Sequence, residues 1–159
     1  MKCLIFSDSH GSFLGMRRAL DKHPDAEVVF FLGDGLSDAD FLARYDKERM
    51  WRAVRGKCDF RSLFCDREAQ KTEEIFLEGK RILATHGDLY QVKYGLENIK
   101  SLAKLRKADI VLFGHTHLPY EEYADGENPF YLFNPGTSSQ SYGILTLNEK
   151  TVLFSHGKL

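Results

Sequence analysis

Cysteine, proline and an excess of charge of either sign are all scarce in this chain. Its 159 residues include three cysteines and four prolines, and 22 Lys+Arg against 23 Asp+Glu give a formal net charge of −1. Three cysteines in a chain of this length argue against a disulfide-stapled secreted scaffold. The balanced charge argues against a nucleic-acid-binding module, whose surface is usually strongly basic.

Long apolar runs are also missing. No stretch approaches the roughly 20 apolar residues that a membrane-spanning helix needs. The first apolar run ends before Ser7 and Asp8, which makes it too short for a secretion signal. We therefore expect a cytoplasmic protein with reduced thiols and no membrane association. Its length predicts a single domain over residues 1–159.

Short apolar runs alternate with helical patterns along the chain. Runs rich in β-branched and aromatic residues predict strands over 2–7, 26–32, 50–54, 81–85 and 109–113. Apolar residues at helical spacing predict helices over 11–23, 36–45 and 95–107. Hairpin signals pair 73–77 with 81–85, 120–124 with 129–133 and 142–147 with 151–155, and leave 60–70 unassigned. The pattern predicts an α/β protein with a mixed sheet, or two sheets with helices outside.

Each of these five predicted strands ends in a loop that carries glycine together with Asp, His or both. The loops are Asp8-Ser9-His10-Gly11, Gly33-Asp34-Gly35, Gly56-Lys57-Cys58-Asp59, His86-Gly87-Asp88 and Gly114-His115-Thr116-His117. Ligands of open α/β sheets bind beyond the carboxyl ends of strands, so we expect the five loops to converge on one site.

Residue spacing within these loops favours a metal site. Residues i and i+2 of an extended chain point the same way, so Asp8 and His10 can reach one ion. By the same rule His115 and His117 can reach one centre or two adjacent ones. Carboxylates and imidazoles together suit Mn, Fe or Zn. Each loop alone has an ordinary interpretation as a cap or turn, but all five in order make a purely structural role a poor explanation.

The remaining histidines and aspartates have simpler interpretations. His23 precedes a proline at a predicted helix end, where a solvated side chain is expected. His156 is expected at the surface of a frayed C-terminus. Asp38, Asp59 and Asp88 are expected to cap backbone groups or to support the ligands.

Taken together, the five loops resemble the motifs of a known family. The ordered set Asp8-x-His10, Gly33-Asp34, Gly56-x-x-Asp59, His86-Gly87 and Gly114-His115-x-His117 resembles the calcineurin-like metallophosphoesterases. The small size and the closing Asn134-Pro135-Gly136-Thr137 resemble its compact bacterial and archaeal phosphodiesterase branch, which also includes the eukaryotic retromer subunit. The resemblance implies a four-layer α/β/β/α sandwich of two mixed β-sheets flanked by helices.

The resemblance also implies a metal-dependent phosphodiesterase acting on a small-molecule phosphodiester. It implies two divalent ions per chain, Mn²⁺ before Fe, Zn, Ni or Mg, which would activate a water for attack on phosphorus. One ion would be held by Asp8, His10, Asp34 and His117, and the other by a bridging Asp34 with His86 and His115. Near the substrate or behind the ligands we expect Lys57, Asp59, Gly114, Thr116 and Asn134. A homo-oligomer is compatible with the sequence.

Two residues depart from the family pattern, which reads Gly-Asn-(His or Cys)-Asp where this chain has Gly56-Lys57-Cys58-Asp59. Lys57 stands where the family has an asparagine, whose amide oxygen can ligate a metal. The lysine ammonium is a cation that can only donate hydrogen bonds. It could turn into solvent, take the place of the second ion, or mark a site that no longer catalyses; we favour the first. Cys58 stands where many members have a histidine, and a thiol is a poor acid at neutral pH, so substrates with good leaving groups are expected.

Two other classes of function compete with this interpretation. A non-catalytic interaction scaffold with a degenerate site would explain Lys57 and Cys58, but it has no need of six ligands. A mononuclear iron oxygenase could use Asp8, His10 and His117, but it leaves His86 and His115 without a role. A metal count separates the phosphodiesterase from the scaffold.

Overall fold

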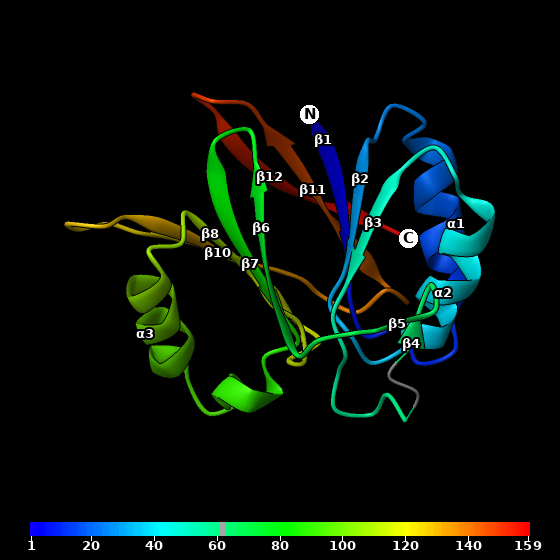
Figure 1. The fold of residues 1–159 in the computed structure, drawn as a ribbon, viewed down its shortest axis with the longest axis horizontal. Helices are drawn as coiled ribbons and strands as arrows, with labels where there is room; N and C mark the ends of the chain where they lie inside the picture. Colours follow the sequence, from blue (N-terminus) through cyan, green and yellow to red (C-terminus); the bar gives the residue numbers. More distant parts are fainter. Residues whose placement is uncertain (61–62) are drawn as a thin grey trace.

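Two five-stranded sheets face each other in the computed structural model, which describes residues 1–60 and 63–159 (Figure 1). The first sheet has the order β12-β11-β1-β2-β3. Its strands are β1 (Lys2–Phe6), β2 (Val28–Phe31), β3 (Met50–Ala53), β11 (Ser141–Leu147) and β12 (Val152–Lys158). Both sheets are mixed: here β1, β2 and β3 run parallel, while β11 is antiparallel to β1 and to β12.

The second sheet has the order β6-β7-β8-β10-β9. Its strands are β6 (Thr72–Leu77), β7 (Lys80–Thr85), β8 (Ile110–Leu112), β9 (Pro119–Ala124) and β10 (Phe130–Pro135). In this sheet β7, β8 and β10 are parallel, and β6 and β9 are antiparallel edge strands.

Helices cover the outer face of each sheet (Figure 1). Two pack on the first sheet, namely α1 (Phe13–Lys22) and α2 (Leu36–Tyr45), and α3 (Glu97–Arg106) packs on the second. A short 3-10 turn, η1 (Asp88–Tyr90), follows β7. These four layers confirm the predicted α/β/β/α sandwich.

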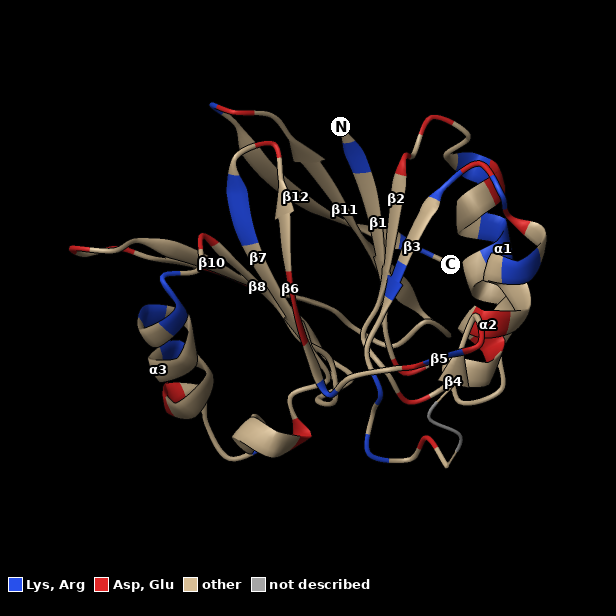
Figure 2. Cartoon of the chain, viewed as in Figure 1, with Lys and Arg blue, Asp and Glu red and all other residues tan. Residues whose placement is uncertain are grey.

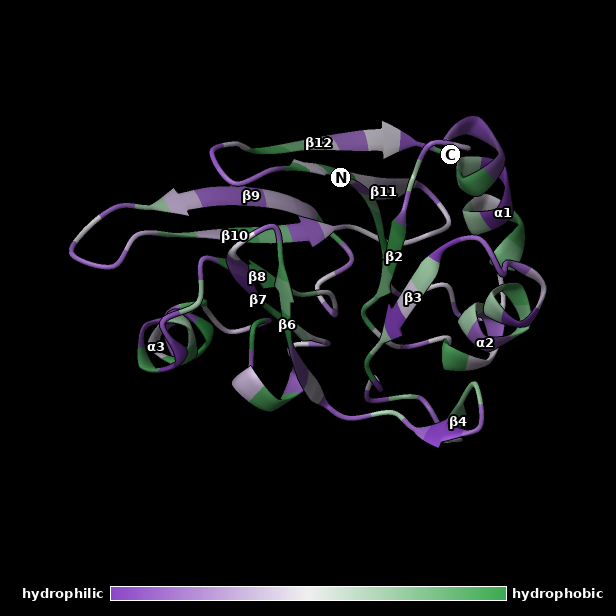
Figure 3. Cartoon of the chain, turned by 45° about the horizontal axis from the view of Figure 1, so that its top comes forward, coloured by the Kyte–Doolittle hydropathy of each residue, from purple (hydrophilic) through white to green (hydrophobic). Residues whose placement is uncertain are grey.

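Side-chain alternation along the buried strands builds the three interfaces between the layers. On β1, Cys3 and Ile5 point between the sheets, whereas Leu4 and Phe6 point to α1 and α2. Behind the second sheet, Val111 of β8 packs against Ile99 of α3. Figure 3 shows hydrophobic colouring along β2 and β8, and Figure 2 shows Lys and Arg on the outer helices α1 and α3. Strands buried on both faces explain why the sequence has unbroken apolar runs.

Two expectations about histidines are corrected here. His156 does not lie in a frayed terminus, because β12 continues to Lys158 and pairs with β11. Its ring stacks on Phe133 and its Nε2 lies 2.8 Å from the Asn134 carbonyl oxygen. His23 is half-buried at the end of α1, and its Nε2 lies 2.8 Å from the Tyr142 hydroxyl, so it is not a solvated side chain.

The segment that the sequence left unassigned contains a small hairpin beside α2. Its strands are β4 (Leu63–Phe64) and β5 (Arg67–Glu68). Residues 61–62 of that segment lie outside the described residues. In the part of the chain that the structure describes, none of the helices combines the length and the hydropathy needed to cross a bilayer.

Candidate metal centre

The five loops lie at the carboxyl ends of parallel strands in both sheets. Asp8 and Asp34 follow the parallel strands β1 and β2 of the first sheet. His86 and His115 follow the parallel strands β7 and β8 of the second. Parallel strands end at the same edge of a sheet, so each sheet presents its polar loops along one edge. The two edges meet, and the six side chains predicted as ligands form two adjacent groups.

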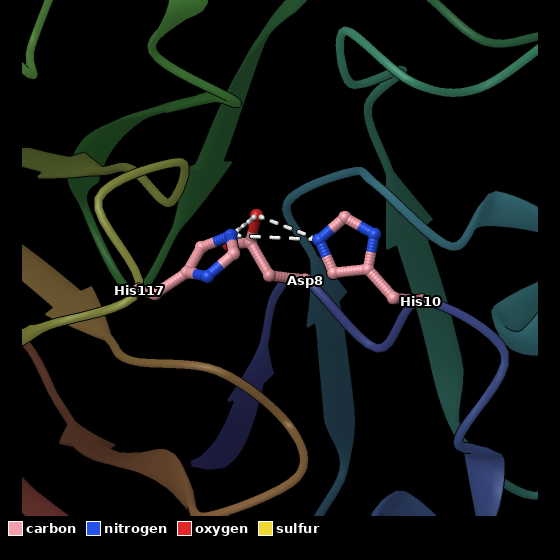
Figure 4. Close-up of side chains that lie close together, drawn as sticks. All are labelled: Asp8, His10 and His117. Carbon is pink, nitrogen blue, oxygen red and sulfur yellow. Dashed lines mark hydrogen bonds and ion pairs between the residues drawn. The ribbon is translucent and has the colours of Figure 1, made fainter.

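The first group contains Asp8, His10 and His117 (Figure 4). The Asp8 Oδ1 atom lies 3.2 Å from His117 Nε2 and 3.9 Å from His10 Nε2. The two imidazole Nε2 atoms are 3.4 Å apart. His10 and His117 are nearly half-exposed, whereas the Asp8 side chain is fully buried beneath them. Solvent therefore reaches this group from the side of the two histidines.

The second group contains Asp34, His86 and His115. His86 Nε2 lies 3.2 Å from Asp34 Oδ2 and 3.0 Å from His115 Nδ1. The other ring nitrogen of His86, Nδ1, lies 2.8 Å from the Leu32 carbonyl oxygen, which can only accept a hydrogen bond. In the neutral ring Nδ1 therefore carries the proton, and the lone pair of Nε2 faces the centre.

Asp8 connects the two groups. Its Oδ1 atom is 4.0 Å from His86 Nε2, so imidazole nitrogens from both groups surround one carboxylate oxygen. The resemblance assigned the bridging role to Asp34, which here groups with His86 and His115. Bridging by Asp34 stays a prediction.

The Asp8 carboxylate also tests whether the site fits a cation. Its Oδ2 accepts hydrogen bonds from the Ser7 hydroxyl and from the His115 backbone N–H, whereas Oδ1 is buried with no hydrogen-bond partner among the described residues. A buried anionic oxygen without a partner is costly. A divalent ion bound by Oδ1 and the neighbouring nitrogens would remove that cost. The carboxylate and imidazole donors thus fit the metals that such mixed ligands favour.

The backbone of the ligand loops has an uncommon conformation. Five of the six residues have positive φ: Asp8 (55°), His10 (45°), Asp34 (58°), His115 (68°) and His117 (64°). Asp and His enter this left-handed region more readily than most residues. Such strain persists where the surroundings enforce it and is typical of functional sites.

Protonation in the second group follows from burial and from opposite charge. Burial opposes ionisation of Asp34, but hydrogen bonds from His86 and from the Cys58 N–H hold the pKa of its carboxyl well below the usual range. Burial also opposes charging of His86, yet Asp34 and Asp8 together raise its pKa. Burial and the neighbouring His86 lower the pKa of His115. Of the two histidines, His86 is thus the one whose protonated form its neighbours favour.

Asp59 ties the loop of Asp34 to the next loop. Its carboxylate accepts four backbone N–H groups at 2.8–2.9 Å, those of Asp34, Gly35, Leu36 and Gly56. Because Gly35 and Leu36 begin α2, the carboxylate also caps that helix. The structure thus places Asp59 behind the ligands, where it holds Asp34 in position.

Asn134 and Gly114 shape the loop of His115 and His117. The Asn134 amide donates to the Gly114 carbonyl at 2.9 Å and to the Thr116 hydroxyl at 3.0 Å. Gly114 leaves no space for a side chain, because an added Cβ would overlap the Ser7 hydroxyl and lie 2.9 Å from Asp8 Oδ2. These contacts put Thr116 and Asn134 behind the ligands.

Cys58 lies at the rim of the centre, in a recess beside His10 and Asp34, and Lys57 precedes it in the same loop. The Lys57 side chain is exposed and makes no hydrogen bond or ion pair with residues 1–60 or 63–159. The Cys58 N–H donates to Asp34 Oδ1 at 2.6 Å. Burial first, and then the Asp34 charge, raise the pKa of the Cys58 thiol, which favours its protonated form at neutral pH.

Sequence reasoning missed two supporting hydroxyls. The Ser7 hydroxyl donates to the Asp8 carboxylate, and the Thr137 hydroxyl donates to the Asp8 carbonyl at 2.8 Å. Ser7 directly precedes a ligand at a strand end, which is the one local signal for its role. Thr137 lies 129 positions away, and nothing local indicates its contact.

With this geometry established, comparison with known proteins identifies the family. The family described as "Calcineurin-like phosphoesterase superfamily domain" matches residues 1–151. The chain belongs to this superfamily. It is 34% identical over 155 residues to the probable metallophosphoesterase YsnB of Bacillus subtilis, covering 92% of this chain and 85% of the relative. It is 30% identical over 170 residues to the phosphodiesterase YfcE of Escherichia coli, covering 91% and 87%.

Solved structures share the fold. An archaeal phosphodiesterase superposes with a TM-score of 0.78 at 21% identity, covering all of both chains. Vps29 of Entamoeba histolytica, solved with zinc, superposes with a TM-score of 0.72 at 20% identity, covering 99% of each chain. Membership in this superfamily implies divalent metal ions, and the two groups of ligands are the candidate places for them.

Proposed function

We propose that this calcineurin-like phosphoesterase is a metal-dependent phosphodiesterase with a dinuclear centre. The observation that carries the proposal is the buried, unpartnered Asp8 Oδ1 with three imidazole nitrogens within 4.0 Å of it. YfcE, which is 30% identical to this chain, is named a phosphodiesterase and adds support.

Each ligand has a distinct task in this proposal. Asp8, His10 and His117 would hold one ion, and Asp34, His86 and His115 the other. Bound ions would supply charge for the transferring phosphoryl group and acidify a water. The Leu32 carbonyl keeps the proton of neutral His86 on Nδ1, so that Nε2 stays available to a metal. The exposed His10 and His117 mark the side from which a phosphodiester approaches.

Lys57 weakens the second ion site in this proposal without abolishing it. Its ammonium cannot coordinate a metal ion. Its side chain is exposed, however, and leaves Asp34, His86 and His115 free to bind one. This placement favours the first of the three outcomes considered for Lys57. We accordingly expect two ions per chain, Mn²⁺ first, with the second bound less tightly.

The leaving group receives little help from the protein in this proposal. The Cys58 thiol stays protonated at neutral pH and is a weak acid. Small activated diesters, such as aryl esters, should therefore react faster than alkyl esters.

The free, exposed thiols of Cys58 and Cys65 fit a reducing cytoplasmic location.

A turnover assay tests this function. Purified protein would be incubated with Mn²⁺ and bis-(4-nitrophenyl) phosphate, beside a His117→Ala variant. We expect release of nitrophenol by the wild type and a loss of at least about a hundredfold in the variant, because one ligand of the first group is removed. Equal rates for the two proteins would refute the enzyme proposal.

A scaffold function is the second candidate, favoured by Lys57 and by the fold shared with Vps29. A metal count on the purified protein, read together with the turnover assay, separates the two. About two equivalents of Mn, Fe or Zn with turnover support the phosphodiesterase, whereas protein that binds none after dialysis against these metals, or that binds metal without turnover, supports the scaffold.

A further inference from the structure

Two recesses flank the candidate metal centre, and His10 lines both. One recess has a volume of about 400 Å³ and lies beside Asp34, Cys58 and Phe60. The other has a volume of about 590 Å³ and lies beside Asp8, His117 and Gln140. The first lies toward the loops after β2 and β3, and the second toward the start of α1 and the loop after β10. The volumes are comparable, and each can hold one organic group.

The first recess offers an aromatic surface. Phe60 stands at its rim with its side chain fully exposed. The two carboxylates in this recess are already engaged, since Asp59 accepts four backbone N–H groups and Asp34 contacts His86 and the Cys58 N–H. Among the described lining residues, the Phe60 ring, the Cys58 thiol and the exposed Ser37 hydroxyl remain for a ligand beside His10, and the fully exposed ring favours an aromatic or apolar group.

The second recess is lined mainly by hydroxyl and amide side chains, with the exposed Leu118 beside them; the polar residues are Ser9, Ser12, Thr137, Ser139 and Gln140. Ser139 and Gln140 are exposed, and the Ser12 hydroxyl makes no capping hydrogen bond to α1. The Ser9 hydroxyl already donates to Asp38 and the Thr137 hydroxyl to the Asp8 carbonyl, so the Gln140 amide and the Ser12 hydroxyl are the groups best placed for a ligand. Among its described lining residues there is neither Lys nor Arg, so this recess does not favour an additional phosphate. A neutral polyhydroxy group, such as glycerol or a sugar, matches this surface.

We propose that the substrate is an unsymmetrical phosphodiester, with an aromatic or apolar alcohol in the Phe60 recess and a neutral polyhydroxy alcohol in the Gln140 recess. The proposal rests on the proposed phosphodiesterase function, because it places the phosphorus beside His10 between the recesses. A monoester would leave one recess empty, and its binding would lack half of the available contacts.

Paired variants and matched substrates test the assignment of the two recesses. Phe60→Ala removes the aromatic platform, Gln140→Ala removes the amide, and Phe76→Ala removes an exposed aromatic from β6 as a control. Each protein, with circular dichroism to verify folding, would be assayed with Mn²⁺ on diphenyl, phenyl glyceryl and diglyceryl phosphate. Phe60→Ala should raise KM roughly two- to tenfold for the phenyl esters but not for the diglyceryl ester. Gln140→Ala should raise KM by a similar factor for the glyceryl esters alone.

A binding measurement separates failure of this inference from failure of the enzyme proposal. The probe is a phosphinate in which a methylene group replaces each bridging oxygen, with one benzyl and one 3,4-dihydroxybutyl arm, titrated calorimetrically into Mn²⁺-loaded protein. Weaker binding by Phe60→Ala and by Gln140→Ala, with Phe76→Ala unchanged, supports the assignment even if no ester is hydrolysed. Turnover of all esters without any arm-specific effect overturns the assignment and leaves the hydrolase intact. Tighter binding of a probe phosphorylated on its hydroxyl arm also overturns it.

Discussion

At the residue scale, backbone conformation and side-chain chemistry select the same residue types in the ligand loops. Five of the six candidate ligands have positive φ, a conformation that alanine adopts reluctantly and that Asn and Asp tolerate. An alanine variant of Asp8, Asp34 or His117 therefore adds backbone strain to the loss of a ligand. Asp8→Asn and Asp34→Asn remove the charge while keeping a side chain suited to the backbone, and they are the cleaner variants.

Lys57 is the residue through which the proposed weakening of the second ion site can be tested. Lys57→Asn introduces the amide of the family pattern next to Cys58, whose N–H contacts Asp34 of the second group. We expect affinity for the weaker Mn²⁺ ion to rise on the order of tenfold, with a matching gain in rate at limiting metal. Metal titration followed by calorimetry measures it.

The matched control for this variant is Lys150→Asn, which removes the same charge from an exposed turn between β11 and β12. It should leave metal affinity unchanged. If Lys57→Asn behaves like this control, Lys57 does not limit the second site.

At the scale of elements, α2 and the loop before it depend on one carboxylate from another loop. Asp59→Ala leaves four backbone N–H groups without their acceptor and uncaps α2. Loss of a cap costs about 1 kcal/mol, and part-buried unpaired donors add to it, so we expect a loss of roughly 2 kcal/mol or more in the free energy of unfolding. Urea denaturation measures it. Asp25→Ala, which removes an exposed carboxylate paired with Lys2, should change stability little.

The end of α1 should make stability depend on pH. Burial, and then the charge of Lys2, lower the pKa of His23 below 6.5, so its folded form resists protonation. Because the unfolded chain binds the proton more readily, this contribution is complete above pH 6.5 and is lost as pH falls from 6.5 toward the folded pKa.

A His23→Gln variant tests that dependence, because its amide can still hydrogen-bond to the Tyr142 hydroxyl. The wild type should lose more stability than the variant between pH 7 and pH 5, measured by urea midpoints. His156→Gln, on the exposed strand β12, is the parallel control. Identical pH profiles for the wild type and His23→Gln would contradict the assignment.

At the scale of the whole molecule, metal binding should raise thermal stability. An ion that binds only the folded chain adds about 2.7 kcal/mol when its free concentration is 100 times its Kd. For a chain of this size that corresponds to a rise of roughly 5–10 °C in Tm. Chelation by EDTA should reverse the rise, as scanning calorimetry would reveal. His117→Ala should show a smaller shift, and a shift equal to that of the wild type would argue against the first group as a metal site.

The sequence could predict those features of the fold and the site that depend on residues close together in the chain. The run over 26–32 indicated a strand because β2 is buried on both faces, and the periodicity over 36–45 predicted α2 with its observed bounds. The ligand loops were also predictable from local sequence, because glycine, Asp and His directly follow the predicted strands.

The pairing of strands that are far apart in the chain could not be predicted from the residue pattern. Nothing in the order of the chain indicates that β11 and β12 join β1, or that β10 lies between β8 and β9. The sequence also failed to predict that His156 lies in an ordered strand. The exposed positions of the edge strand β12 carry polar residues, and such a pattern is also typical of a disordered terminus. Supporting contacts such as Leu32 to His86 span 54 positions and follow only from the fold.

The distribution of the ligands over the two sheets has a consequence for assembly. Asp8, His10 and Asp34 come from the first sheet and His86, His115 and His117 from the second, so each group draws on both. An ion bound by the first group would then join the two sheets and close a chain segment of 107 positions between His10 and His117. Neither sheet alone offers more than two ligands of either group. We therefore expect complete ligand groups only where the two sheets are docked, so that separation of the sheets would release the ions.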